Sequence, residues 1–386
     1  MPKIVRILNR FNVGGPTYNV AYLTKYISSE YSTILLGGQK NESEASSEYI
    51  LQELDVAYTI IPEMKRSIGI WNEIKALRKL IRIIKTEKPD IVHTHAAKAG
   101  TLGRIAAWYC GVPYIFHTFH GHVFHSYFNP LTTKIFITIE QLLAKTCTAI
   151  VAISDIQKHE IGTVFKICPP HKIEVIPLGF DLEKFTKDIQ TKRLQFRQQY
   201  NLEHNEIAIG IVGRLVPVKN HELFIQAFQK CLHISTKPIK AFIIGDGEMR
   251  HELESLWNTI EPGKNNSKLT FTSWIQDVDV AYAGLDIVCL TSHNEGTPVS
   301  LIEAQAAGKP IVSTNVGGIQ NIVIEGKTAL LTNNTVEDFS NKLLQIIENE
   351  ELQKQMSNHS QQFSLEKFGY KRLCKDMEHM YEKYIT

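Results

Sequence analysis

Two acidic residues frame a short segment in the second half of the sequence, SHNEGTPVSLIEAQAAGKP (292–310). An apolar run before it predicts a strand, and the run after Pro298 predicts a helix, whose first turn tolerates proline because the missing N–H has no partner there. Glu295 therefore precedes the helix, and Glu303 lies inside it. Free backbone N–H groups at a helix start favour anions and hydroxyl oxygens, so both acids could hold one ligand. An ordinary helix with an acid near its start is the alternative.

Two cations follow another apolar run, in GIVGRLVPVKNHELFIQAF (210–228). A strand is predicted to end at Gly213, and a helix to start near Asn220. Arg214 and Lys219 lie in the loop between them. Two positive charges beside a helix start are suited to a diphosphate, and a surface loop with two solvated cations is the alternative.

Histidines are concentrated in the first half, in HTFHGHVFHSYF (117–128). This segment begins within a predicted strand and continues past its end. Metal binding is one interpretation, but no carboxylates stand nearby to support the ligands. Neutral histidines at a strand end are the other interpretation. His93 and His95, which end another strand, favour a structural role. The four histidines of the cluster are His117, His120, His122 and His125.

Two further patterns exclude other functions. The first loop, NVGGP, places Gly14 and Gly15 where the backbone can approach a ligand closely, but it is not the GxGxxG of a dinucleotide site. Asp277 and Asp279 form an Asp-x-Asp triplet, a spacing that can bind metal. We expect these acids to open a helix instead, where the helix dipole favours them.

The segment WNEIKALRKLIRIIKTEK (71–88) predicts an amphipathic helix with basic residues beside its apolar stripe. Such a helix can lie on an anionic membrane, although a packed surface helix with a solvated face is the commoner case. The predicted apolar stripe comprises Trp71, Ile74, Leu77, Ile81 and Ile84.

Short apolar strands alternating with helices must position these residues. This alternation predicts parallel sheets covered on both faces, and hence an α/β fold of two Rossmann-like, doubly wound lobes that face each other across a cleft. We expect an N-terminal domain over 1–178, a C-terminal domain over 179–364, and a C-terminal helix over 365–386 that packs back on the N-terminal domain. The predicted strands are 3–8, 32–37, 57–61, 90–95, 114–119 and 149–154, then 207–213, 241–247, 268–273, 286–292 and 310–315.

Composition bounds the class of protein. The 386 residues are 43% hydrophobic and 21% charged, which is typical of globular domains, and the six cysteines form no CxxC pair. No run of about 18 apolar residues and no signal peptide are present, so we expect a cytoplasmic protein. Residues 1–180 hold 20 Lys and Arg against 14 Asp and Glu, whereas residues 181–386 hold 22 against 26. A basic first half would suit an anionic or membrane-bound acceptor.

Taken together, these segments resemble the retaining GT-B glycosyltransferases of family 4. The resemblance rests on EGTPVSLIE, which matches their Glu-x7-Glu segment, and on GRLVPVKN in the same lobe. It also rests on IPLGFDLEKF, similar to their interdomain crossing, and on AIVAIS before it. It covers nearly the whole chain in the right order.

The resemblance implies roles for individual residues. Arg214 and Lys219, beside Gly213, would hold the donor diphosphate. Glu295 would bind sugar hydroxyls with help from backbone N–H groups, and Glu303 would bind the ribose. His120 would face the transferred sugar. The residues assigned to backbone binding of the sugar are Gly296 and Thr297, those near the nucleobase are Ile244 and Trp274, and those on the acceptor side are Gly14, Gly15, His122 and His125.

The function that the resemblance implies is transfer of a hexosyl unit, with retention, from a UDP- or GDP-sugar to a saccharide or lipid-linked acceptor in polysaccharide or glycoconjugate synthesis. No cofactor, metal or nucleic acid is expected, and contact with the inner face of the cell membrane is a further expectation. The alternative is a nucleotide-sugar epimerase of GT-B architecture, which would turn over its donor without an acceptor.

Overall fold

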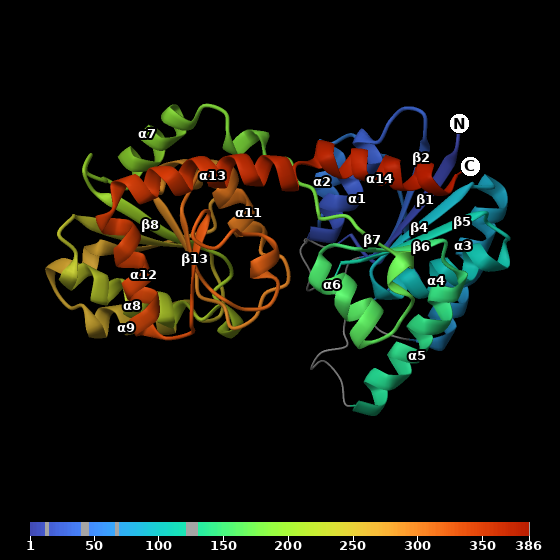
Figure 1. Ribbon diagram of the computed structural model, residues 1–386, viewed down its shortest axis with the longest axis horizontal. Coiled ribbons are helices and arrows are strands. Elements are labelled where there is room, and N and C mark those ends of the chain that lie inside the picture. Colours follow the sequence, from blue (N-terminus) through green and yellow to red (C-terminus); the bar gives the residue numbers. More distant parts are fainter. Residues whose placement is uncertain (12–14, 40–45, 66–68, 121–129, 386) are drawn as a thin grey trace. The chain divides into compact units, whose positions relative to one another are not determined.

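The computed structural model divides into two compact units (Figure 1). The N-terminal unit comprises Met1–Phe180 and Phe368–Thr386, and the C-terminal unit comprises Asp181–Lys367. The chain re-enters the N-terminal unit next to the point where it left, because the Phe180 N–H donates to the Phe368 carbonyl at 2.8 Å. The described residues are 1–11, 15–39, 46–65, 69–120 and 130–385.

A seven-stranded parallel sheet forms the centre of the N-terminal unit, in the order β3-β2-β1-β4-β5-β6-β7. The apolar runs predicted from the sequence form its first six strands, and the short edge strand β7 was not predicted. Since neighbouring strands are parallel, their carboxyl ends lie along one edge of the sheet. The strands are β1 Lys3–Leu8, β2 Ser32–Gly38, β3 Tyr58–Ile61, β4 Ile91–His95, β5 Tyr114–Phe119, β6 Ala149–Ala152 and β7 Ile173–Val175.

Helices cover both faces of this sheet. On one face, α3, α4 and α5 share a core with the sheet through residues such as Leu80, Ala106 and Ala144. On the other face, α1 and α14 pack through Leu23 and Met377. The helices are α1 Gly15–Tyr26, α2 Glu48–Glu53, α3 Ile70–Glu87, α4 Ala97–Tyr109, α5 Pro130–Thr146, α6 Asp155–His159 and α14 Tyr370–Tyr384.

The orientation of α3 confirms most of the stripe predicted for 71–88, since Ile84 is buried and Leu77 and Ile81 pack partly buried against the core. Ala76, Leu80 and Ile84 are its buried residues. Trp71, which was expected in the apolar stripe, is 75% exposed. The sequence contains more apolar residues on this helix than the core accepts, and alanine was left out of the predicted stripe although it packs well.

The C-terminal unit repeats the plan with a six-stranded parallel sheet, in the order β10-β9-β8-β11-β12-β13. Its core is formed by apolar strand residues and by the inner faces of α8 and α12. The strands are β8 Ile207–Val212, β9 Ile239–Ile244, β10 Leu269–Ser273, β11 Ile287–Leu290, β12 Ile311–Thr314 and β13 Ala329–Thr332. The helices are α7 Ile189–Gln199, α8 His221–Ile234, α9 Arg250–Ile260, α10 Val278–Gly284, α11 Val299–Ala306, α12 Val336–Glu348 and α13 Glu350–Phe368.

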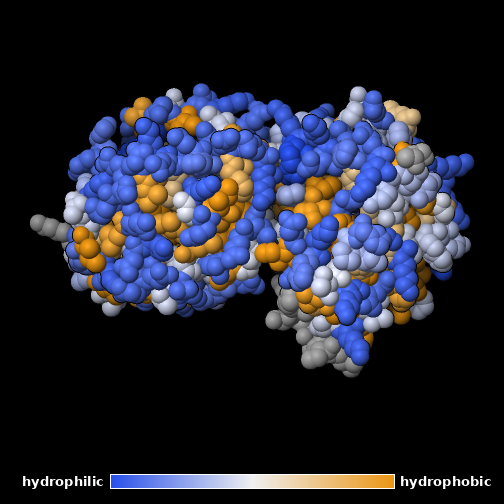
Figure 2. Space-filling model, in the orientation of Figure 1, coloured by the Kyte–Doolittle hydropathy of each residue, from blue (hydrophilic) through white to orange (hydrophobic). Residues whose placement is uncertain are grey.

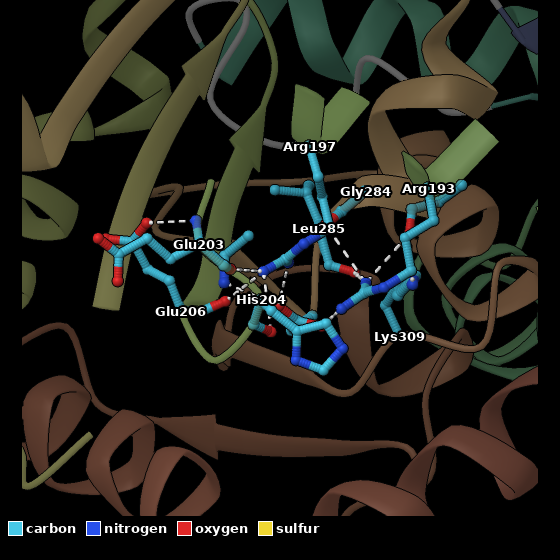
Figure 3. Close-up of polar contacts among 11 residues, drawn as sticks. Arg193, Arg197, Glu203, His204, Glu206, Gly284, Leu285 and Lys309 are labelled. Carbon is cyan, nitrogen blue, oxygen red and sulfur yellow. Dashed lines mark hydrogen bonds and ion pairs between the residues drawn. The ribbon is translucent and has the colours of Figure 1, made fainter. Parts of the chain in front are cut away.

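Two arginines of α7 fix the start of β11, which leads to the candidate site (Figure 3). Arg193 donates to the carbonyls of residues 283–285, each at 3.4 Å, and so satisfies groups that the end of α10 leaves without helical partners. Its second nitrogen binds Asp286 at 2.7 Å, and Arg197 contacts the same carboxylate at 3.3 Å. Asp286 also accepts from the Ala208 N–H at 2.8 Å, so α7, β8 and β11 are joined at one carboxylate.

The structure differs from the predicted elements in two respects. β7 is only three residues long, too short for a clear apolar pattern, and the four-residue strand β13 was missed although β11 and β12, of the same length, were predicted. The helical stretch predicted near the C-terminus is interrupted at Gly369, whose extended backbone (φ −68°, ψ 139°) separates α13 from α14.

The surface seen in Figure 2 is hydrophilic over most of both units, with hydrophobic residues scattered between.

Candidate active site

The loop after β8 brings the two predicted cations to the carboxyl edge of the C-terminal sheet. The Gly213 N–H donates to the Ile244 carbonyl at 3.0 Å, which holds the loop against the end of β9. Gly245 follows with φ +142°, and a Cβ there would lie 1.9 Å from the Gly213 carbonyl oxygen, so only glycine fits. Arg214 is exposed, and Lys219 ends the 3₁₀ turn Pro217–Lys219 just before α8.

Lys219 and Glu295 form an ion pair that sequence reasoning did not predict. The Lys219 ammonium lies 2.5 Å from Glu295 Oε1, and the Ser292 hydroxyl donates to the same oxygen at 2.6 Å. The side chains of Lys219 and Glu295 are 21% and 10% exposed. Thr291 also donates to the Lys219 carbonyl at 3.1 Å. These contacts hold the Lys219 and Glu295 side chains in one orientation at the carboxyl ends of β8 and β11.

A pair of glycines after β12 completes this part of the site. The Gly318 N–H donates to the Glu295 carbonyl at 2.9 Å. A Cβ on Gly317 (φ +53°) would lie 2.0 Å from the Glu295 oxygen, and one on Gly318 would lie 1.9 Å from the Gly296 oxygen. The two loops can pack this closely only because both residues are glycine. The second NVGG of the sequence, at 315–318 after a predicted strand, could have indicated these glycines, but no role was predicted for it.

Glu303 lies on α11, where Tyr282, Lys184 and Asp279 act on its carboxyl group. Burial raises the pKa of Glu303 to about 7, while Lys184 and a hydrogen bond with Tyr282 act in the opposite direction. Asp279 adds a smaller upward effect on this pKa. Carboxyl groups with strongly raised pKa values occur often at functional sites, which makes Glu303 a candidate ligand-binding residue.

The other residues predicted in this unit lie in the loop before α11 and at the strand ends. α11 begins at Val299 with Pro298 as its N-cap, so the proline precedes the first turn instead of occupying it, which corrects the predicted boundary. Gly296 and Thr297 therefore lie in the loop ahead of the helix. At the strand ends, the Ile244 side chain is buried and Trp274 is 60% exposed, so of these two only the indole offers a side chain to a nucleobase.

The Asp-x-Asp triplet has a structural environment. Asp277 is the N-cap of α10, as predicted, and Asp279 lies in the first turn of that helix. Asp279 pairs with Lys192 at 2.9 Å. Among the described residues, no three His, Cys, Asp or Glu side chains are placed to hold one metal ion.

In the N-terminal unit, His120 directly follows β5 and contacts His95 from the end of β4. The distance from His95 Nδ1 to His120 Nε2 is 3.0 Å, and the rings are stacked with centroids 5.3 Å apart. Burial lowers the pKa of His120 to about 3, so this imidazole is neutral at physiological pH. Its Nδ1 is buried without a hydrogen-bond partner in the described part of the chain.

A buried polar network lies behind this pair, in agreement with the structural role predicted for His93 and His95. Arg6 Nη1 donates to the Tyr381 hydroxyl at 3.0 Å, and that hydroxyl lies 2.6 Å from His93 Nδ1. His93 Nε2 contacts the Thr118 hydroxyl at 2.8 Å. Burial, with a smaller effect of the Arg6 charge, keeps the pKa of His93 well below its usual value. Arg6 was missed because its strand reads as continuously apolar around it.

Other N-terminal expectations are only partly covered by the structure. His117 lies inside β5, not at its end, where it contacts the Thr94 hydroxyl at 2.8 Å. Gly15 is the first residue of α1. Gly14, His122 and His125, predicted on the acceptor side, lie outside the described residues.

Comparisons with known proteins show the family of the chain. The family model for glycosyl transferases group 1 matches residues 192–363, and the model for glycosyltransferase family 4 matches residues 13–184. The UDP-Gal:alpha-D-GlcNAc-diphosphoundecaprenol alpha-1,3-galactosyltransferase of Escherichia coli is 33% identical over 295 residues, covering 76% of this chain and 75% of that protein. The capsular polysaccharide biosynthesis glycosyltransferase CapM of Staphylococcus aureus is 26% identical over 343 residues, covering 87% of each.

Solved structures give the same fold. Anabaena HepE in complex with UDP has a TM-score of 0.82 at 18% identity, covering 99% of this chain and 100% of that one. A glycosyltransferase from Rickettsia africae has the same TM-score at 19% identity, covering 100% and 99%. The two units are therefore the Rossmann-like domains of a GT-B glycosyltransferase. Within that class, the chain belongs to glycosyltransferase family 4, as the sequence motifs predicted.

Proposed function

We propose that this glycosyltransferase takes a hexosyl unit from a UDP-sugar bound in the C-terminal unit and transfers it to a lipid-linked saccharide. The observation that supports this most is the ion pair of Lys219 and Glu295, whose ammonium and carboxylate groups lie 2.5 Å apart beside two glycine-containing loops. We call this ion pair and the two loops the cradle. The choice of uridine and of a lipid-linked acceptor follows the names of the relatives, one of which uses UDP-Gal and a diphosphoundecaprenol acceptor.

Each group of the cradle has a part in donor binding. Arg214 and the Lys219 ammonium would hold the diphosphate, and its negative charge would draw Lys219 partly away from Glu295. The Glu295 carboxylate, with the backbone N–H groups of Gly296 and Thr297, would then bind the sugar hydroxyls. Glu303 would accept hydrogen bonds from the ribose, and Trp274 offers a flat surface to the base.

In the proposed reaction, the bond between the anomeric carbon and the β-phosphate oxygen breaks, and a bond to the acceptor hydroxyl oxygen forms. The departing phosphate takes the proton of that hydroxyl. Charge develops on the diphosphate, where Arg214 and Lys219 stabilise it electrostatically without a metal ion. Retention of configuration, and a hydrogen bond from His120 to the transferred sugar, complete the proposal. Unchanged turnover in EDTA would support the metal-free course, and loss of turnover that Mg²⁺ restores would contradict it.

The donor site is tested by Lys219→Ala against Lys230→Ala. Lys230 also pairs with a glutamate of the same unit, Glu337, but lies on α8 away from the strand ends, so it is a matched control. Loss of a charged hydrogen bond is worth about 1.5–3 kcal/mol, so UDP should bind about 10- to 100-fold more weakly to Lys219→Ala than to wild type. The affinity of Lys230→Ala should be unchanged. Equal UDP affinity of the two variants in calorimetry would refute the assignment.

The epimerase alternative is tested in the same preparation. Wild-type protein is incubated with the UDP-sugar alone, and the sugar is analysed for isomers. The proposal predicts that no isomer accumulates and that turnover begins when acceptor is added. Isomer formation without acceptor would show that the protein is an epimerase and not a transferase.

A further inference from the structure

The exposed residues of the helix layer formed by α3, α4 and α5 have an unusual composition. All three helices pack on the same face of the N-terminal sheet, so their solvent-facing sides point away from that sheet. None of the exposed residues described in these helices is acidic. The exposed cations are Lys75, Arg78, Arg82, Lys85, Lys134 and Lys145.

These cations are not neutralised by the protein. Within the described residues, no ion pair joins any of the six to an acid, whereas Lys79 on the edge of α3 pairs with Glu63 at 3.6 Å. Lys85 lies 5.2 Å from the centre of the Tyr109 ring, which links α3 to the end of α4. Uncompensated positive charge on one side of a domain attracts a surface of opposite charge.

Large apolar side chains lie among the cations. Trp71 precedes the basic stripe of α3, and Trp108 is 65% exposed at the end of α4. On α5, the exposed apolar residues recur at helical spacing and so line one side of the helix. A pocket of about 500 Å³, which Leu142 and Lys145 line together, opens beside them. The exposed apolar residues of α5 are Ile135, Ile139 and Leu142.

We infer that this layer is a docking surface for an anionic lipid bilayer. Cations beside exposed tryptophans and aliphatic residues suit a membrane interface, where the charges meet lipid phosphates and the indoles lie at headgroup level. Within the described residues, no helix is long and apolar enough to span a membrane. The bilayer would be a further partner of this glycosyltransferase. The inference rests on the proposed function in one respect only: a lipid-linked acceptor would be reached from a membrane.

Vesicle binding tests the surface without relying on catalysis. Wild-type protein should co-sediment with vesicles of equimolar phosphatidylglycerol and phosphatidylcholine, and less with phosphatidylcholine alone. A cation near an anionic membrane strengthens binding about fivefold, so the double variant Arg78→Gln, Arg82→Gln should bind about 30-fold more weakly. The control is Lys327→Gln, Lys354→Gln, which removes the same charge from exposed positions of the C-terminal unit and should bind as wild type does.

Tryptophan fluorescence shows which residues enter the interface. A blue shift on adding the anionic vesicles should be reduced in Trp71→Phe and in Trp108→Phe, but not in Trp274→Phe. Equal binding by the two double variants, or wild-type binding to an acidic polypeptide but not to vesicles, would overturn the inference. UDP affinity should be unchanged in Arg78→Gln, Arg82→Gln, so a failure of membrane binding is distinguishable from a failure of the donor site.

Discussion

Replacing Glu303 by glutamine should make the C-terminal unit more stable and the donor site weaker. Burial raises the pKa of Glu303 from an ordinary 4.5 to about 7, so the folded protein holds this proton more tightly than the unfolded chain does. The free energy of unfolding therefore falls as the pH rises from 4.5 to 7, and it stays reduced above pH 7. Glutamine has the shape of the protonated acid and avoids this loss.

The size of the effect follows from the shift of the pKa. A rise of the Glu303 pKa from 4.5 to about 7 corresponds to about 3 kcal/mol of stability lost above pH 7. Glu303→Gln should recover most of this at pH 8 and almost none at pH 4. UDP binding should change in the opposite direction, weakening about 10- to 100-fold, because a charged acceptor for the ribose hydroxyls is lost.

Urea unfolding at pH 4 and pH 8, with UDP titrations at pH 8, measures both effects. Glu252→Gln is the control, since Glu252 is exposed on α9 of the same unit. If Glu303→Gln and Glu252→Gln had the same stability at pH 8, the raised pKa of Glu303 would be wrong. If Glu303→Gln were stabilised but bound UDP as tightly as wild type, its role in ribose binding would be refuted.

Three further results are expected. Gly245→Ala should fold poorly or lose UDP binding, measured by calorimetry, because its Cβ would lie 1.9 Å from the Gly213 oxygen; normal affinity would contradict this packing. Tyr381→Phe should lower the free energy of urea unfolding by about 1–3 kcal/mol, since it removes the hydroxyl that contacts His93, and an unchanged value would show that the network contributes nothing. The ring resonances of His120 should not titrate above pH 4 in NMR spectra; a midpoint near 6.5 would show that this imidazole is not buried.

Much of the fold could be predicted because strands buried on both faces are continuous apolar runs. β1 and β5 have the predicted bounds, and most other strands differ by a few residues at their ends. β7 could not be found this way, because three residues carry no clear pattern, and β13 was missed although other strands of four residues were found. On α3 the predicted stripe wrongly included the exposed Trp71, since a pattern of apolar residues does not show how wide a stripe the core will cover.

The residues of the candidate site could be proposed one by one from the sequence, but their contacts could not. Lys219 and Glu295 are 76 positions apart, and they meet because β8 and β11 are neighbours in the sheet, an order that the sequence does not state. The same applies to Arg6, whose partner Tyr381 comes from the other end of the chain. Residue types indicate chemistry, whereas strand order decides which of them can act together.

Transfer itself tests the central claim most directly. The protein is incubated with a panel of UDP-hexoses and an N-acetylhexosaminyl diphosphate lipid in anionic vesicles, and the product is analysed by mass spectrometry and by the NMR coupling of its new anomeric proton. We expect one hexose to be added, with the anomeric configuration of the donor retained, and with turnover greatly reduced in Lys219→Ala. Product of inverted configuration, or equal turnover by the Lys219→Ala variant, would contradict the account.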